Sequence, residues 1–192
     1  MNNLAVFASG SGSNFQAIVD AIKQGQLDAK VVLLVCDKPN AFVLQRAEKE
    51  GIPYFLFNPK DYPNKTAYET IILANLQKLS IDYIVLAGYM RLIGETILSK
   101  YEEKIVNIHP SLLPAFPGKD AIGQALQAGV KVTGVTIHYV DEGMDTGTII
   151  DQHAVSISPD DTKESLQKKV QEIEHQLYPS VLKRLLKKIV NT

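Results

Sequence analysis

The sequence lacks the features that mark several classes of protein. It has one cysteine, Cys36, which ends an apolar run and therefore reads as a core residue, because no disulfide can form within the chain. The formal net charge is −1, which offers no basic surface for nucleic acid. No apolar run is long enough to cross a bilayer, and the first residues lack the basic segment and cleavage site of a signal peptide. These absences predict a cytoplasmic protein with no membrane or nucleic-acid partner.

The composition is that of an ordinary globular protein. Hydrophobic residues make up 45% of the chain and charged residues 21%. The length of 192 residues is somewhat long for one average domain and short for two, and the sequence has no repeat, low-complexity segment or linker. We therefore expect a single domain over residues 1–192.

Apolar runs alternate with helix-like segments along most of the chain. Strands separated by helices pair in parallel through right-handed crossovers. The pattern predicts an α/β fold: an open, mostly parallel twisted sheet of about seven strands with helices on both faces and a Rossmann-like N-terminal half. Strands are expected at 4–8, 31–36, 53–57, 83–87, 105–109, 131–140 and 148–157, and helices at 14–22, 41–50, 65–79, 93–101, 120–127 and 163–190.

Two segments are expected to depart from this regular pattern. Residues 131–140 alternate between apolar and polar, which favours a half-exposed strand that is antiparallel or at an edge. Pro179 falls near the middle of the last helix and has no backbone N–H. The helix is therefore expected to break or kink at or just before Pro179.

A glycine-rich loop, residues 10–14, joins the first strand to the first helix. Glycine permits positive φ and close backbone approach, and the N–H groups at a helix N-terminus favour an anion. Phe15 stands where the dinucleotide fingerprint has its third glycine, so NAD or FAD is not expected even though Asp37 would suit a ribose. The loop suits a single phosphate; the alternative is a structural turn in which Ser13 or Asn14 caps the helix.

A polar pair, Asn107 and His109, stands at the end of the fifth strand. Alternation with apolar neighbours places both side chains on one face, and Pro110 ends the strand. In an open α/β sheet, ligands bind at the carboxyl ends of strands. Asn107 is therefore suited to hold an oxyanion and His109 to move a proton, whereas the alternative is a structural histidine.

An acidic loop, residues 141–147, joins the last two strands. It contains three carboxylates and two glycines, and a carboxylate beside His109 would stabilise the protonated ring. With no serine or cysteine nucleophile among these groups, the set suits direct attack by a substrate amine on a carbonyl. The alternatives are a solvated turn and a weak cation site, although the spacing differs from that of an EF-hand. The other histidines do not cluster in sequence with one another or with Cys36, so no metal site is expected.

Together these motifs resemble the formyltransferases that use 10-formyltetrahydrofolate. The resemblance implies transfer of the formyl group to the amine of 5-phosphoribosylglycinamide in purine biosynthesis, by direct amine attack through a tetrahedral intermediate. No metal and no NAD would be needed, and the protein would be a monomer or homodimer. The resemblance covers essentially the whole chain and rests on residues 10–14, 87–91, 107–114, 116–118, 141–147 and 174–179.

The resemblance also implies roles for individual residues. Asn107, His109 and Asp145 would form the catalytic trio, with Asp145 stabilising the protonated form of His109. Lys65 stands where some relatives have arginine, so a charge contact is expected there but not a bidentate one. The substrate-binding set would be Ser11, Gly12, Ser13, Asn14 and Glu174, and the folate-binding set would be Lys65, Met90, Arg91, Leu92, Ile93, Asn107, Val140 and Asp141.

Three other functions are alternatives to this one. A formyltetrahydrofolate hydrolase (deformylase) usually has an N-terminal regulatory domain, whereas the first strand here is expected from residue 4. Methionyl-tRNA formyltransferase carries a further C-terminal domain for tRNA, for which the chain leaves no room, and the net charge does not suit tRNA. A sensor of phosphate or nucleotides would keep the glycine-rich loop but would have no use for the catalytic trio.

Overall fold

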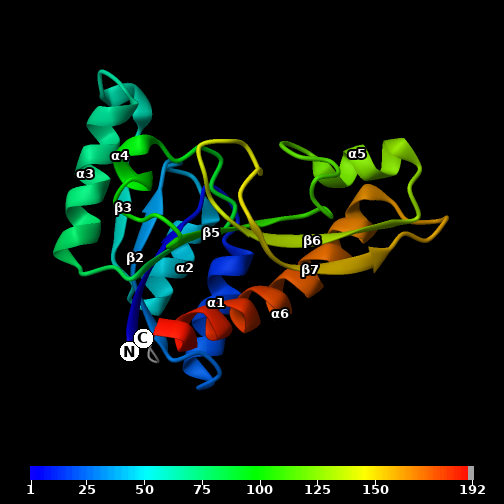
Figure 1. Ribbon diagram of the computed structural model, residues 1–192, viewed down its shortest axis with the longest axis horizontal. Coiled ribbons are helices and arrows are strands. Elements are labelled where there is room, and N and C mark those ends of the chain that lie inside the picture. The colour runs from blue at the N-terminus through cyan, green and yellow to red at the C-terminus, as the bar shows by residue number, and fades with distance from the viewer. Residues whose placement is uncertain (190–192) are drawn as a thin grey trace.

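The computed structural model of the chain describes residues 1–189, with side chains up to residue 187, and contains one seven-stranded sheet. The strand order is β3-β2-β1-β4-β5-β6-β7 (Figure 1). The first five strands are parallel to one another, β6 is antiparallel to β5, and β7 is antiparallel to β6. This confirms the predicted α/β fold and mostly parallel sheet. The strands are β1 (Asn2–Phe7), β2 (Ala29–Cys36), β3 (Tyr54–Leu56), β4 (Tyr83–Leu86), β5 (Ile105–His109), β6 (Val132–Tyr139) and β7 (Ile149–Ser156).

Helices cover both faces of the sheet, as predicted. Along β1 the side chains alternate between two cores: Leu4 belongs to the core that α1, α2 and α6 cover, whereas Phe7 belongs to the core under α3 and α4 (Figure 1). Burial on both faces explains why the parallel strands are continuous apolar runs. The helices are α1 (Ser13–Lys23), α2 (Phe42–Glu50), α3 (Lys65–Lys78), α4 (Glu95–Leu98), α5 (Ala121–Ala128) and α6 (Lys163–Ile189), with a 3₁₀ turn η1 (Pro59–Asp61).

Helix α6 continues through Pro179, so the predicted break is wrong. Proline removes one backbone hydrogen bond, but Tyr178, Val181 and Leu182 beside it are fully buried. Because tertiary packing supplies most of the stability of a helix in a protein, this burial outweighs the lost bond. The predicted end at Val190 lies outside the described residues. None of the helices within residues 1–189 combines the length and apolarity needed to cross a membrane.

Strand β6 is antiparallel, as predicted, but it is buried on both faces rather than half-exposed. It lies between β5 and β7, and its residues from Thr133 to His138 are all buried. Its polar face is covered because the Thr136 hydroxyl donates to the Ser111 carbonyl at 2.7 Å and accepts from the Leu113 N–H at 3.0 Å. A chain segment far away in the sequence therefore shields the side chains whose alternation suggested exposure.

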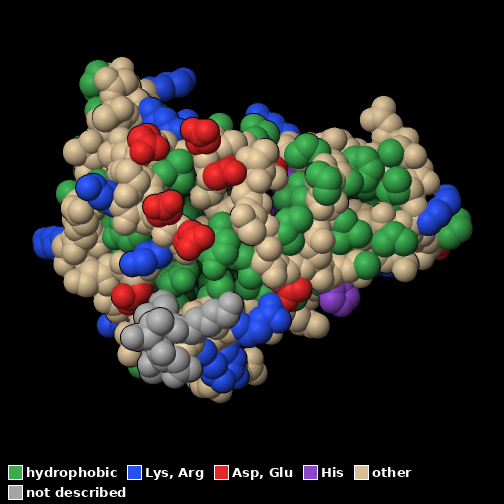
Figure 2. Space-filling model, in the orientation of Figure 1, with side chains coloured by type: hydrophobic (Ala, Val, Ile, Leu, Met, Phe, Trp, Pro, Cys, Tyr) green, Lys and Arg blue, Asp and Glu red, His purple; other side chains and the backbone are tan. Residues whose placement is uncertain are grey.

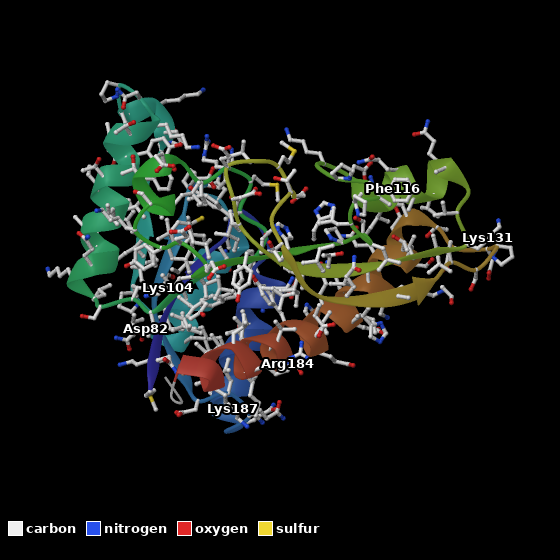
Figure 3. All side chains as sticks on the ribbon, viewed as in Figure 1. Asp82, Lys104, Phe116, Lys131, Arg184 and Lys187 are labelled. Carbon is white, nitrogen blue, oxygen red and sulfur yellow. The ribbon has the colours of Figure 1, made fainter. Side chains whose placement is uncertain are left out.

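Strand β7 forms the exposed edge of the sheet. Its Ile149 is 43% exposed, and Figure 2 shows hydrophobic side chains at the surface over α5, β6 and β7. Arg184, labelled on α6 in Figure 3, forms an ion pair with Asp151 of β7. The long helix thus holds the edge strand as well as packing on the centre of the sheet.

Tyr178 fastens α6 to the centre of the sheet. Its hydroxyl lies 2.8 Å from the Leu86 carbonyl oxygen of β4 and 3.0 Å from the Val106 carbonyl oxygen of β5, and the side chain is fully buried. Removal of a buried hydrogen-bond donor leaves its acceptors unpaired.

The substitution Tyr178→Phe is expected to lower the free energy of unfolding by about 1–2 kcal/mol, because the two carbonyls lose their shared donor. Urea denaturation followed by circular dichroism measures this loss. Tyr54→Phe is the matched control, because the Tyr54 hydroxyl contacts Glu48 at the exposed surface and its removal should change stability by less than about 0.5 kcal/mol. Equal unfolding midpoints for the two variants would contradict the anchoring role.

Candidate active site

A cavity of about 550 Å³ opens along the carboxyl ends of β1, β4 and β5. Ligands of open α/β sheets bind in such a crevice, where the strand order reverses, here between β1 and β4. The cavity collects most of the residues that the sequence singled out. Those in its lining are Ser11, Gly12, Ser13, Asn14, Met90, Arg91, Leu92, Ile93, Asn107, His109, Val140, Asp145 and Glu174.

The glycine-rich loop presents the N-terminus of α1 to this cavity. Gly12 precedes the helix with φ of +73°, and a Cβ there would collide with Val43, so both the conformation and the space require glycine. No side chain within the described residues caps α1, so the cap from Ser13 or Asn14 that a purely structural turn predicted is not formed. The first N–H groups of α1 therefore have no side-chain acceptor among the described residues, an arrangement that suits a bound anion. Arg46 supports the loop from behind by donating to the Ser11 carbonyl at 2.9 Å.

Asn14 and Glu174 form a buried polar pair beside this loop. The Asn14 amide donates to the Glu174 carboxyl at 3.1 Å, and Glu174 is only 7% exposed. Burial raises the pKa of Glu174 to about 7, against the opposing effect of the hydrogen bond from Asn14. The Asn14 side-chain oxygen is buried and has no hydrogen-bond partner among the described residues. The pair therefore holds a carboxyl that changes charge near neutral pH and an unused acceptor.

The imidazole of His109 is held between a carbonyl and a carboxylate. Its Nε2 lies 2.9 Å from the backbone oxygen of Phe116, which Figure 3 labels beside α5. A carbonyl can only accept, so Nε2 carries a hydrogen and Nδ1 is the nitrogen free to exchange a proton. Nδ1 lies 3.4 Å from Asp145 Oδ2, slightly beyond a typical hydrogen bond. The structure thus brings together the two groups that the sequence placed 36 positions apart.

Asp145 lies in the loop between β6 and β7, which contacts of its own hold in place. The residue has φ of +57°, and the backbone N–H of Gly118 donates to its Oδ2 at 2.8 Å. Burial by itself raises the pKa of the Asp145 carboxyl, but the hydrogen bond from the Gly118 N–H and the electrostatic attraction of the nearby imidazoles of His109 and His138 outweigh it and hold the pKa below its usual value. Asp145 is therefore a carboxylate at neutral pH.

A second histidine, His138, completes the cluster around Asn107. The Asn107 side-chain nitrogen lies 3.2 Å from His138 Nε2, and Asp145 Oδ1 lies 3.7 Å from the same atom. His138 is 2% exposed and lines the cavity. Sequence reasoning missed it, although it shares the polar face of its strand with the buried Thr136.

The opposite wall comes from the segment after β4. Arg91 forms an ion pair with Asp37 at 2.7 Å, and Asp37 also accepts from the Ser9 hydroxyl at 2.6 Å. Both oxygens of the Asp37 carboxylate therefore contact other residues of the protein, and neither is free for a ribose. Met90 and Leu92 are 65% and 46% exposed, which gives this side of the cavity an apolar rim.

Two residues of the predicted folate set lie outside the cavity lining. Lys65 points toward Glu69 on α3, with the two charged groups 3.9 Å apart. Asp141 turns into its own loop, where it accepts from the Gly143 N–H at 3.0 Å and from the Thr146 hydroxyl at 2.6 Å. The structure therefore does not bring Lys65 and Asp141 together with the other predicted residues.

Helix α6 adds polar residues that the sequence reasoning missed. Lys163, Gln167 and Gln171 line the cavity along with Glu174. Their spacing of four, four and three residues places them on one face of the helix, which is a signal that the sequence did contain. Lys163 also pairs with Asp120 at 2.9 Å, across the cavity end of α5. Within residues 1–189, no three His, Cys, Asp or Glu side chains gather in a way that could hold a metal ion.

Comparison with known proteins agrees with this geometry. Residues 2–182 match the formyl transferase family. The chain is 58% identical to phosphoribosylglycinamide formyltransferase of Bacillus subtilis over 186 residues, which is 97% of this chain and 95% of that protein. It superposes on glycinamide ribonucleotide transformylase 1 of Geobacillus kaustophilus with a TM-score of 0.94 and 64% identity, covering 97% of this chain and 99% of the other. It superposes on phosphoribosylglycinamide formyltransferase of Bacillus halodurans with a TM-score of 0.95 and 57% identity, covering 98% of this chain and 97% of the other.

The raised pKa of Glu174 predicts a pH-dependent cost in stability. Between pH 4.5, the ordinary value, and about 7 the folded protein keeps a proton that the unfolded chain releases, so stability falls as pH rises through this window. Glu174→Gln removes the charge and provides an N–H for the unpartnered oxygen of Asn14. At pH 8 the variant is expected to be about 2–3 kcal/mol more stable than the wild type, and this gain should vanish near pH 4.

Urea denaturation at the two pH values measures this difference. Glu172→Gln is the matched control, because Glu172 lies two residues before Glu174 on the other side of α6 and is exposed. The control should show the pH dependence of the wild type. A Glu174→Gln variant whose stability follows pH as the wild type does would show that the Glu174 carboxyl is not destabilising.

Proposed function

This chain belongs to the formyl transferase family, and on that basis we propose that it transfers the formyl group of 10-formyltetrahydrofolate to the amine of 5-phosphoribosylglycinamide in purine biosynthesis. The observation that carries this proposal is the meeting of Asn107, His109 and Asp145 in the cavity that also contains the uncapped N-terminus of α1. The two small molecules are the proposed substrates, and the cytoplasm is the proposed location.

The ribonucleotide is proposed to occupy the end of the cavity near α1. Its phosphate would lie against the loop formed by Ser11, Gly12, Ser13 and Asn14, where free N–H groups and the helix dipole favour negative charge. Glu174, buried beside Asn14, would accept hydrogen bonds from the ribose or glycinamide part. This arrangement would direct the glycine amine toward Asn107 and His109.

The folate is proposed to lie along the wall of Met90, Arg91, Leu92, Ile93 and Val140. The exposed apolar side chains Met90 and Leu92 suit the flat rings of a pterin, and the backbone of this segment offers polar groups to its edge. Lys65 and Asp141 stay predicted contacts for the folate, although in this structure the Lys65 side chain contacts Glu69 and the Asp141 side chain contacts Thr146. The formyl carbon would then sit beside Asn107.

The proposed reaction proceeds by direct attack. The amine nitrogen forms a bond to the formyl carbon, and the carbonyl electron pair moves onto oxygen to give a tetrahedral oxyanion. The Asn107 N–H and the protonated His109 would stabilise that oxygen. The oxyanion then collapses and the bond to the folate nitrogen breaks, while the amine loses a proton and the folate nitrogen gains one. His109 Nδ1, facing the Asp145 carboxylate, is the atom placed to handle these protons.

Incubation of the protein with 10-formyltetrahydrofolate, with and without 5-phosphoribosylglycinamide, tests this function. Loss of the formyl-folate absorbance only when the ribonucleotide is present, together with formylated ribonucleotide in the products, is the expected result. Loss without the ribonucleotide would instead indicate the hydrolase. Ribonucleotide binding by calorimetry without any folate turnover would indicate a sensor.

Substitution of the proton-handling residues tests the mechanism. His109→Ala and Asp145→Ala are each expected to lower kcat by about 10²–10⁴-fold, because proton transfer in the transition state is lost. Calorimetric binding of the ribonucleotide should persist, since its phosphate is proposed to contact the N-terminus of α1. His153→Ala and Asp160→Ala are matched exposed controls and should keep wild-type turnover. Near-wild-type kcat in His109→Ala or Asp145→Ala would contradict the mechanism.

A further inference from the structure

We propose that His138 is a positioning residue that fixes the orientation of the Asn107 side-chain amide. This inference rests on the proposed function, because it assigns His138 a part in stabilising the oxyanion. His138 lies on β6 directly across from Asn107 on β5, in the register that pairs the two residues. Opposite residues on neighbouring strands present their side chains to the same face, so the imidazole and the amide are held side by side.

The backbone decides which nitrogen of His138 carries the hydrogen. Nδ1 lies 2.7 Å from the carbonyl oxygen of Tyr139, the next residue. A carbonyl oxygen only accepts hydrogen bonds, so Nδ1 must be the donor. In the neutral ring Nε2 then has a lone pair and no hydrogen. The fold therefore presents His138 to the cavity as an acceptor.

This acceptor determines which end of the Asn107 amide faces it. The amide nitrogen lies 3.2 Å from His138 Nε2, a distance at which an N–H donates to the ring. Rotating the amide by half a turn would place its oxygen against the Nε2 lone pair, which is repulsive. One N–H of Asn107 is thus engaged, and the second is left on the same nitrogen for a developing oxyanion in the cavity.

Asp145 is the other possible target of His138, and the geometry makes it the weaker one. The nearest carboxylate oxygen is 3.7 Å from Nε2, which is too long for a hydrogen bond. With Nδ1 donating to Tyr139, the neutral ring has no hydrogen to offer that carboxylate. Asp145 already accepts from Gly118 and faces His109. His138 therefore acts on Asn107.

Two variants that differ by one methylene separate the contact from the rest of the side chain. In His138→Asn the short amide can still donate to the Tyr139 carbonyl but cannot reach Asn107, whereas in His138→Gln the longer amide oxygen can accept from Asn107. We expect His138→Asn to lower kcat by about 10–100-fold, as loss of a supporting hydrogen bond typically does, with KM for both substrates little changed. His138→Gln should recover kcat to within a few fold of the wild type.

A double-mutant cycle tests whether the effect acts through Asn107. In an Asn107→Ala background, His138→Asn should cost less than about a further twofold in kcat, because the amide that it orients is gone. In an Asp145→Asn background, His138→Asn should lower kcat by the same factor as in the wild type, about 10–100-fold. The proposal is overturned if the cost persists in the first background or disappears in the second, or if the Gln variant is no more active than the Asn variant.

A measurement on the wild-type protein does not depend on enzyme activity. The imidazole ¹⁵N chemical shifts of His138, assigned from the resonances that vanish in His138→Gln, should show a protonated Nδ1 and a bare Nε2 near neutral pH. A hydrogen on Nε2 instead would overturn the proposal. If the tautomer is as expected but the wild type formylates no ribonucleotide, then the proposed function fails and the geometric role of His138 is left standing.

Discussion

The antiparallel pairing of β6 with β5 is the constraint on which the site depends. It places His138 opposite Asn107 and Thr136 opposite His109, on one face of the sheet. The chain leaves this ladder beside the start of β5 and rejoins the sheet at Ile149, opposite His138. The loop between β6 and β7 must therefore fold back over the face that carries the histidines, and it delivers Asp145 to within 3.4 Å of His109.

The loop that delivers Asp145 is held by its own backbone and side chains. Asp141 accepts from Gly143 and Thr146 within the loop. Gly147 packs so close to the Tyr139 carbonyl that a Cβ would overlap it, so glycine is required there. A buried carboxylate needs hydrogen bonds to stay charged, and the Gly118 N–H supplies one. Contacts within the protein thus fix the position of the charge.

Helix α6 links the stability of the fold to the chemistry of the cavity. Near its start it offers a polar face to the cavity that ends with Glu174, and one turn later Tyr178 bonds to β4 and β5. Burial of Glu174 costs stability at neutral pH, since the pKa of its carboxyl is raised to about 7. A buried carboxyl that lowers the stability of the fold is typical of a binding site rather than of a structural core.

Sequence patterns alone predict the order of the elements, the shared face of Asn107 and His109, and the glycine loop before α1. These features follow from local rules, namely the periods of strands and helices and the backbone freedom of glycine. Three features depend on the tertiary structure: the Phe116 carbonyl orients His109, His138 contacts Asn107, and Lys65 and Asp141 lie outside the cavity lining. The burial of β6 on both faces and the continuation of α6 through Pro179 also depend on it. The reason is physical: burial and hydrogen-bond partners come from segments that are distant in the chain, and no local pattern records them.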